Sequence, residues 1–136
     1  MNTLGTMEFH STEYARNNGV PLDHVLEAFL LAADKDGTRL IVHNIDFDDR
    51  VIGAEIDQLA INATVSLRPR FCTMRSTVKE CRTPRRGGGY KWPLLQELHL
   101  HLFGCHFPGG HDAIKDVQAT ARCFFELRRR GLVQYG

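Results

Sequence analysis

The sequence predicts a single α/β domain over residues 1–136, with about four helices and a reduced sheet of about two parallel strands. Three observations lead to this prediction. The chain has 136 residues, of which 43% are hydrophobic, and this suits one globular domain around its own core. Apolar residues recur at helical spacing in several segments. Short β-branched apolar runs, typical of buried parallel strands, stand between those segments.

The first predicted helix spans residues 21–33 and is followed by the first predicted strand, residues 39–43. Pro21 suits the first position of a helix, because its missing N–H would have no partner there. The apolar positions of this helix repeat at helical spacing: Val25, Leu26, Phe29, Leu30 and Ala33. A second helix is expected directly after the polar residues 44–48, on the spacing of Val51, Ile52, Ile56 and Leu59.

The second half of the chain predicts one more strand and two more helices. Residues 71–74 are the strand candidate. A helix opens at Trp92-Pro93 and ends near Gly104, with its apolar positions at Leu94, Leu95, Leu98 and Leu102. The last helix runs from about Asp112 to Arg130, and we expect it to bury Ile114, Val117, Ala121 and Phe124. Gly131 then ends it.

Charge is distributed unevenly along a chain whose formal net charge is only +1. Residues 68–91 carry eight basic side chains and one acidic one, whereas residues 1–67 carry four basic and eleven acidic ones. A basic segment of this kind can contact the phosphates of a nucleic acid. The alternative is a solvated basic loop that balances the acidic half of the chain.

Cysteine usage and hydropathy both favour a cytoplasmic protein. The four cysteines form no Cys-x-x-Cys pair, so we expect free thiols. No apolar run approaches the roughly 20 residues that a membrane helix needs, and residues 1–14 do not read as a secretory signal. His99, Cys105 and His106 raise a zinc site as a minor hypothesis, against the interpretation of helix-surface histidines and a buried thiol.

Two groups of polar residues are candidates for a functional site. Asp46, Asp48 and Asp49 follow the first predicted strand, at the end of a strand where open α/β sheets bind ligands. For Asp46 and Asp49 the favoured interpretation is helix capping. His111 precedes the last helix and Asp116 lies within it; a carboxylate there can hold a divalent metal while the histidine takes a proton from water.

Together, these segments resemble the DEDDh 3′-5′ exonucleases, a family that includes the proofreading epsilon subunit of bacterial DNA polymerase III. Residues 40–48 (LIVHNIDFD) and 51–56 (VIGAEI) resemble the second exonuclease motif, and residues 111–122 (HDAIKDVQATAR) resemble the third. The connecting segments also fit the family: residues 71–75, 91–98 and 102–104. The resemblance covers about residues 9–130.

The resemblance implies a ribonuclease H-like fold and hydrolysis of terminal nucleotides of DNA or RNA with two Mg²⁺ or Mn²⁺ ions. Asp48 and Asp116 are then the metal ligands and His111 the general base. Asn44 and Phe47 match the family pattern and shape the loop, with Phe47 expected in the core. Single-stranded or frayed 3′ ends are the expected partner, and a DNA polymerase is a further candidate. The nucleic-acid contacts are predicted at Asn44, Arg82, Arg85, Arg86 and Lys91.

One departure from the family qualifies this expectation. The family's first motif, Asp-x-Glu, occurs nowhere in the 136 residues, so we expect a domain that lacks the family's N-terminal strands. Two ions carry four positive charges, which two carboxylates do not balance. The strand at residues 39–43 would keep an open edge, which predicts a homodimer or a complementary chain. We therefore expect weak or no hydrolysis by the isolated chain. The alternative function is a non-catalytic module that binds nucleic acid or a protein partner.

Overall fold

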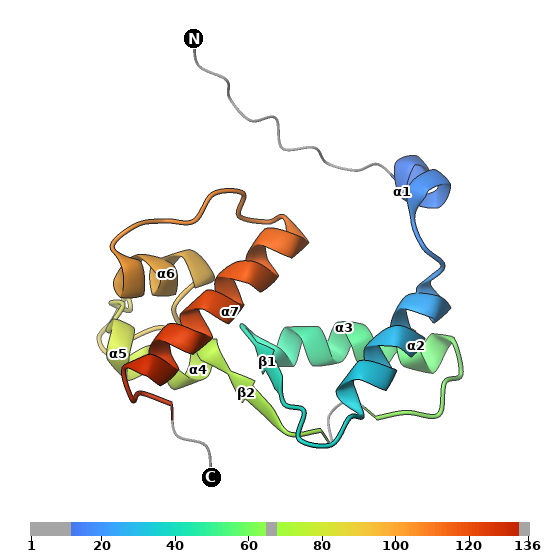
Figure 1. The fold of residues 1–136 in the computed structure, drawn as a ribbon. Helices are drawn as coiled ribbons and strands as arrows, with labels where there is room; N and C mark the ends of the chain where they lie inside the picture. The colour runs from blue at the N-terminus through green and yellow to red at the C-terminus, as the bar shows by residue number, and fades with distance from the viewer. Residues whose placement is uncertain (1–11, 65–67, 134–136) are drawn as a thin grey trace.

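Two parallel strands, β1 (Leu40–Val42) and β2 (Arg70–Cys72), form the centre of the computed structural model (Figure 1). The structure describes residues 12–64 and 68–133, so residues 9–11 and 65–67 of the family resemblance lie outside the described part. The helices are α1 (Thr12–Asn18), α2 (Leu22–Ala33), α3 (Ile45–Gln58), α4 (Thr73–Ser76), α5 (Val78–Cys81), α6 (Leu95–Phe103) and α7 (Ala113–Arg129). Within the described residues the fold is therefore α/β and mostly helical, and the predicted class is confirmed at this level.

Most of the predicted elements are present, with two changes at their boundaries. The strand expected at residues 71–74 ends at Cys72, because the chain turns into α4 at Thr73. The helix expected from Trp92 begins at Leu95, where the Glu97 carboxylate accepts a hydrogen bond from the Leu94 N–H (2.7 Å). Helices α1, α4 and α5 were not predicted, since runs of 7, 4 and 4 residues are too short to show a clear apolar period.

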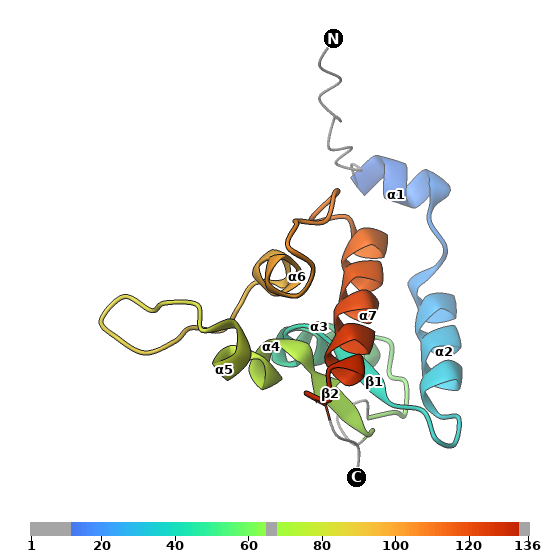
Figure 2. The same cartoon turned by 60° about the vertical axis from the view of Figure 1, so that its left-hand side comes forward.

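The sheet separates two hydrophobic clusters. Successive side chains of a strand point to opposite faces, so Ile41 and Leu40 contact different cores. Ile41 packs against the α6/α7 cluster, which consists of Leu98, Leu102, Cys123, Phe124, Leu127 and Val133. Leu40 packs against the α2/α3 cluster, which consists of Leu26, Leu30 and Ile56. Helices α6 and α7 therefore cover one face of β1, and α2 and α3 cover the other (Figure 2).

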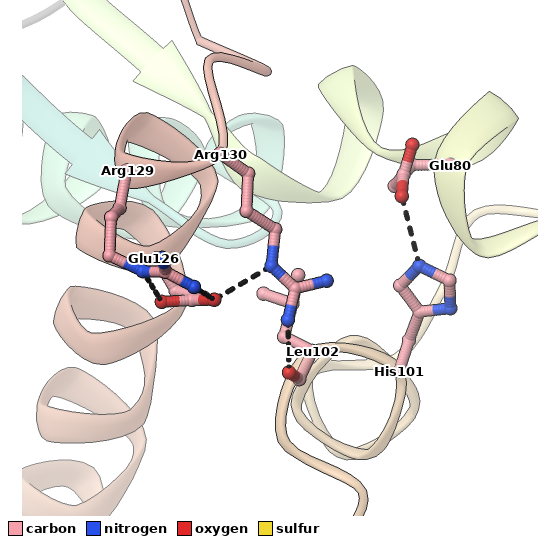
Figure 3. Close-up of polar contacts among 6 residues, drawn as sticks. All are labelled: Glu80, His101, Leu102, Glu126, Arg129 and Arg130. Carbon is pink, nitrogen blue, oxygen red and sulfur yellow. Dashed lines mark hydrogen bonds and ion pairs between the residues drawn. The ribbon is translucent and has the colours of Figure 1, made fainter.

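Polar contacts hold the C-terminal end of α7 against α6, as Figure 3 shows. The Arg130 guanidinium donates to the Leu102 carbonyl (2.5 Å) and to the Glu126 carboxylate (2.7 Å). A second contact joins α5 to α6, where the His101 ring lies 3.1 Å from the Glu80 carboxylate. Helix α7 is thus fixed at the end farthest from its first turn, and this orients the residues near its N-terminus.

The predicted core face of α7 is wrong in part. Phe124 is buried as expected, but Ile114 and Val117 are each 69% exposed and Ala121 is exposed as well. The helix buries instead the face that carries Ala119, Thr120, Cys123, Phe124 and Leu127. Together with Phe125, which is 61% exposed, the three residues form an apolar stripe at helical spacing, here called the α7 stripe. Periodicity alone does not distinguish two neighbouring apolar faces of one helix.

Helix α3 shows a similar departure at Phe47. This residue was expected in the core, yet its side chain is 54% exposed. Phe47 and Val51 line a surface groove of about 350 Å³ along α3. The core side of α3 is formed by Ile45 and Ile56, which are buried, and by the half-buried Ile52.

The predicted free state of the four thiols is confirmed, since none forms a disulfide. Cys123 is buried in α7, and burial is the main cause that raises the pKa of its thiol to about 12. This thiol is therefore a protonated core group. Among the described residues, no helix combines the length and the apolar character that crossing a membrane requires.

Candidate functional site

The candidate site begins where the chain leaves β1. Asn44 adopts a left-handed conformation (φ 75°), which asparagine tolerates better than most residues, and this reverses the chain into α3. The Asn44 carbonyl then accepts a hydrogen bond from the Phe47 N–H (3.1 Å). Asn44 therefore builds the loop that presents the following aspartates, in agreement with its expected role in shaping this loop.

The three aspartates at the start of α3 have different surroundings. The Asp46 carboxylate pairs with Arg75 and the Asp49 carboxylate pairs with Arg70. Both are thus held by cations from α4 and β2, and ion pairing replaces the capping role favoured from the sequence. Asp48 has no ion pair with a cation in the described part of the chain, although its side chain is partly buried.

The environment of Asp48 disfavours its charge. Burial raises the pKa of this carboxyl, and the negative charge of Asp49 raises it further. A partly buried carboxylate without a cation is costly for the fold, and groups of this kind occur more often at functional sites than elsewhere. Carboxylate oxygen is also the donor that Mg²⁺ and Mn²⁺ prefer.

His43, the residue directly after β1, is the half-buried histidine of the candidate site. Its Nε2 lies 3.0 Å from the Pro93 carbonyl, which can only accept, so Nε2 carries the proton. Nδ1 lies 2.9 Å from the Thr73 hydroxyl and accepts from it in the neutral ring. Burial lowers the pKa of His43, against the opposing effects of the Pro93 carbonyl and the charge of Asp116. The ring is therefore neutral near pH 7.

The electrostatic contact with His43 also locates Asp116. Helix α7 packs against β1, and the Asp116 carboxylate in its first turn is close enough to act on the imidazole. Asp48 lies in the first turn of α3, immediately beyond the same end of β1. Asp48 thus follows the C-terminal end of β1, and the charge of Asp116 acts on His43 at that same end.

His111, the predicted general base, is less closely placed. It is exposed, in a left-handed conformation (φ 76°), in the loop before α7. The neighbouring Asp112 caps α7 by accepting from the N–H groups of Ile114 (3.0 Å) and Lys115 (3.1 Å). No hydrogen bond or ion pair joins His111 to Asp48 or Asp116 in the part of the chain that the structure describes.

The described residues hold no complete metal centre. Across residues 12–64 and 68–133, no three His, Cys, Asp or Glu side chains are grouped so that they could bind an ion. Asp48 and Asp116 have the right chemistry for a hard cation but provide two carboxylates only.

The zinc hypothesis also loses support. His99 is 1% exposed, contacts the Cys105 carbonyl through Nδ1 (2.7 Å) and packs on Phe103 (4.6 Å between ring centroids). It is a core residue, not a surface histidine.

Half of the basic side chains in residues 68–91 are engaged inside the fold. Four of them form ion pairs: Arg68 with Asp34, Arg70 with Asp49, Arg75 with Asp46, and Lys91 with Glu97. Lys91, a predicted nucleic-acid contact, lies 2.8 Å from the Glu97 carboxylate and so ties its segment to α6. The other four are exposed and have no ion pair with a described carboxylate: Lys79, Arg82, Arg85 and Arg86.

Residues 83–91 form a protruding turn, here called the basic hairpin. The Lys91 N–H donates to the Thr83 carbonyl (2.9 Å), and the Arg85 N–H donates to the Gly89 carbonyl (3.0 Å). Three glycines at positive φ make its tip, where other residues would be strained. Figure 2 shows the segment between α5 and α6 projecting away from the helices. Arg85 and Arg86 directly precede the three glycines of the tip and are both exposed.

The functional residues that sequence reasoning missed are His43 and Thr73. The signal for His43 was its position at the end of a buried strand, but only the fold shows its contacts with Pro93 and Thr73.

No family model, no curated protein and no solved structure matches this chain. Its function therefore has to be argued from the chemistry of the site.

Proposed function

We propose that this chain is a 3′-5′ exonuclease domain of the DEDDh type, with a ribonuclease H-like fold, that contributes part of a two-metal site. One observation supports the proposal: Asp48 follows the C-terminal end of β1, and the charge of Asp116, from α7, acts on the neutral His43 at that same end. The carboxyl ends of parallel strands are the usual ligand sites of open α/β sheets. The parallel pair β1 and β2, with helices on both faces, supports the fold assignment.

Asp48 and Asp116 would hold the ions, because carboxylate oxygen is the donor that Mg²⁺ and Mn²⁺ prefer. A bound cation would compensate the Asp48 carboxylate, whose pKa is raised mainly by burial. Two Mg²⁺ or Mn²⁺ ions, when bound, stabilise the attacking and leaving oxygens of a phosphodiester. His43 is a positioning residue, because it joins β1 to Thr73 and Pro93 and so fixes the end of the strand from which Asp48 follows.

His111 is proposed to take the proton from the attacking water. Its imidazole is exposed on a loop and is free to approach substrate from solvent. Imidazole is the side chain most often used as a general base in enzymes. Asp112, which caps α7, fixes the start of the helix directly after this loop.

The proposed site needs a complementary chain at the open edge of β1. The Leu40 N–H donates to the Pro69 carbonyl (2.9 Å), and alternate residues direct their backbone groups to opposite edges. The N–H and carbonyl of Ile41 therefore point away from β2, and no further strand pairs there within the described residues. A second copy of this chain would bring a Leu-Ile-Val strand without carboxylates, so a different chain with acidic residues fits the chemistry better.

The test combines metal binding with hydrolysis of 3′-labelled single-stranded DNA and RNA. We expect weak Mn²⁺ binding by calorimetry, lost in Asp48→Asn and Asp116→Asn and kept in Asp57→Asn, which alters an exposed carboxylate on the same helix as Asp48. We expect little or no hydrolysis by the isolated chain. Mn²⁺ binding that survives both site variants would overturn the proposed site. Robust hydrolysis by the isolated chain that disappears in Asp116→Asn and His111→Ala would overturn the need for a partner.

A second candidate is a non-catalytic module that binds nucleic acid. The observation that favours it is the basic hairpin, whose Arg85 and Arg86 have no ion pair with a described carboxylate. Binding that falls steeply with salt, with no hydrolysis even when a complementary chain is supplied, would favour this candidate. If Arg85→Ala combined with Arg86→Ala leaves binding and its salt dependence unchanged, the hairpin is a solvated loop.

A further inference from the structure

The base of the basic hairpin carries an exposed tryptophan. Trp92 is 56% exposed, and Tyr90, two residues earlier, is 49% exposed. Large aromatic side chains usually contribute to the core, so two of them exposed side by side indicate a surface that contacts something else. Trp92 is also the only tryptophan of the chain.

Polar contacts connect Trp92 to the candidate site. The Arg75 guanidinium lies over the indole, 5.7 Å from the ring centroid, and the same guanidinium pairs with Asp46 at the start of α3. The next residue, Pro93, is buried and accepts from His43 through its carbonyl (3.0 Å). Trp92 is therefore held between the hairpin and the C-terminal end of β1, the strand that leads to Asp48.

The chemistry of this surface suits a single strand of nucleic acid. An exposed indole with a guanidinium beside it offers a flat face on which an unpaired base can stack. Arg85 pairs with Gly89 across the hairpin, three residues or about 10 Å along its arm from Trp92, so Arg85 and Arg86 can contact the phosphates that follow. In a duplex the base faces are already stacked on one another, so this surface favours single strands over duplexes.

We propose that single-stranded nucleic acid binds along the basic hairpin with one base stacked on Trp92. This inference deepens the proposed function, on which it rests, by naming a substrate-binding residue and the direction in which the strand leaves the site. Trp92 binds the base, and Arg85 and Arg86 bind the backbone. Arg75 holds the indole in place through its contact with the ring and its ion pair with Asp46.

The test is a fluorescence titration of the single tryptophan with oligo(dT), in EDTA so that no hydrolysis takes place. Stacking is expected to quench the emission with single strands and much less with a duplex of the same length. Base stacking is worth about 1–3 kcal/mol, so Trp92→Leu should weaken binding of a labelled oligonucleotide roughly 5- to 150-fold. Trp92→Phe should restore most of the affinity, and Leu94→Ala, a change in a 63% exposed neighbour, should have no effect.

The salt dependence of binding distinguishes the contribution of the arginines from that of Trp92. The double variant Arg85→Ala, Arg86→Ala should lower the salt slope of log K by about 1.4, whereas Trp92→Leu should leave the slope unchanged. Equal quenching by single strands and duplexes, or unchanged affinity in Trp92→Leu, would overturn the inference, and so would docking of a protein at this surface with no nucleic-acid binding. Binding as expected without hydrolysis under any metal or partner would refute the exonuclease and leave this inference standing.

Discussion

The two sides of β1 differ in how completely they are packed. On one side the α6/α7 cluster has six buried members, among them Leu98 and Cys123 at 0% exposure. On the other side the α2/α3 cluster has three buried members, and α2 leaves Leu22 (44%), Val25 (48%) and Leu31 (66%) exposed. Both sides come from equally apolar helices, so composition is not the cause. Residues of β1, β2 and α5 also pack on the α6/α7 cluster, whereas β1 is the one further element that contributes to the α2/α3 cluster among the described residues.

This difference indicates where stability and association reside. The α6/α7 cluster is closed and supplies most of the apolar burial, and stability follows buried apolar area. The apolar side chains that α2 leaves exposed remain available to a partner.

The largest expected effect is the removal of a side chain from the closed cluster. Leu98→Ala should cost about 2–5 kcal/mol of unfolding free energy, because Leu98 is fully buried and its neighbours cannot collapse into the cavity. Leu26→Ala, in the less complete cluster, should fall at or below the lower end of that range. Urea denaturation measures both, and an equal or larger loss in Leu26→Ala would remove the distinction between the two sides.

A smaller effect is expected on the pH dependence of stability, through His43. Its pKa in the folded state lies below the ordinary value of 6.5, mainly because of burial. The stability that this neutral ring contributes is therefore complete above about pH 6.5 and is lost as the pH falls toward the folded-state pKa. The melting temperature should fall between about pH 7 and pH 5, and it should fall less in His43→Gln. His106→Gln, which alters an exposed histidine, is the matched control and should follow the wild type.

The pH dependence of stability that Asp48 causes should have the opposite sign. Its pKa is raised from 3.8 by burial and by Asp49, so the folded state loses stability as the pH rises through that raised value. Asp48→Asn should therefore raise the melting temperature by a few degrees near pH 7, with a gain that disappears toward about pH 4. Asp57→Asn, at an exposed site, should change little. A destabilising effect of Asp48→Asn would show that this carboxylate serves the fold and not a ligand.

The smallest expected effect on stability is at the α7 stripe. Val117 is 69% exposed, so Val117→Asp should change the unfolding free energy of the isolated chain by at most about 0.5 kcal/mol. Urea denaturation measures this change. A loss of more than about 1 kcal/mol in the isolated chain would mean that the stripe is already covered within the fold.

Local patterns predicted the main elements because those patterns are strong. The segments of α2, α3 and α7 each carry apolar residues at helical spacing over 12 residues or more, and β1 is a pure β-branched and leucine run. Asp48 and Asp116 were predicted as metal ligands because they occupy motif positions, and this role stays a prediction. His111 was identified in the same way, yet the structure shows no polar contact between it and either carboxylate among the described residues.

The ion pairing and the exposure of residues whose neighbours are distant in the sequence were not predictable. Arg70, Arg75 and Lys91 are part of a basic run in the sequence, but each is paired with a carboxylate that only folding brings near. Phe47 has the composition of a core residue and is exposed, because α3 turns its Ile52 and Ile56 face toward the sheet. A side chain's exposure depends on which elements cover it, and that information is absent from local spacing.

The sequence by itself determined the α/β class, the order of the main helices and strands, the free cysteines and the positions of Asp48 and Asp116. These properties follow from local periodicity, turn chemistry and motif spacing, which act within a few residues. Only the tertiary structure decided which face of α7 is buried, which basic residues remain available and that Trp92 stands exposed beside the site. Those properties depend on long-range packing and on charge pairing, in which one residue's environment is supplied by residues far away in the chain.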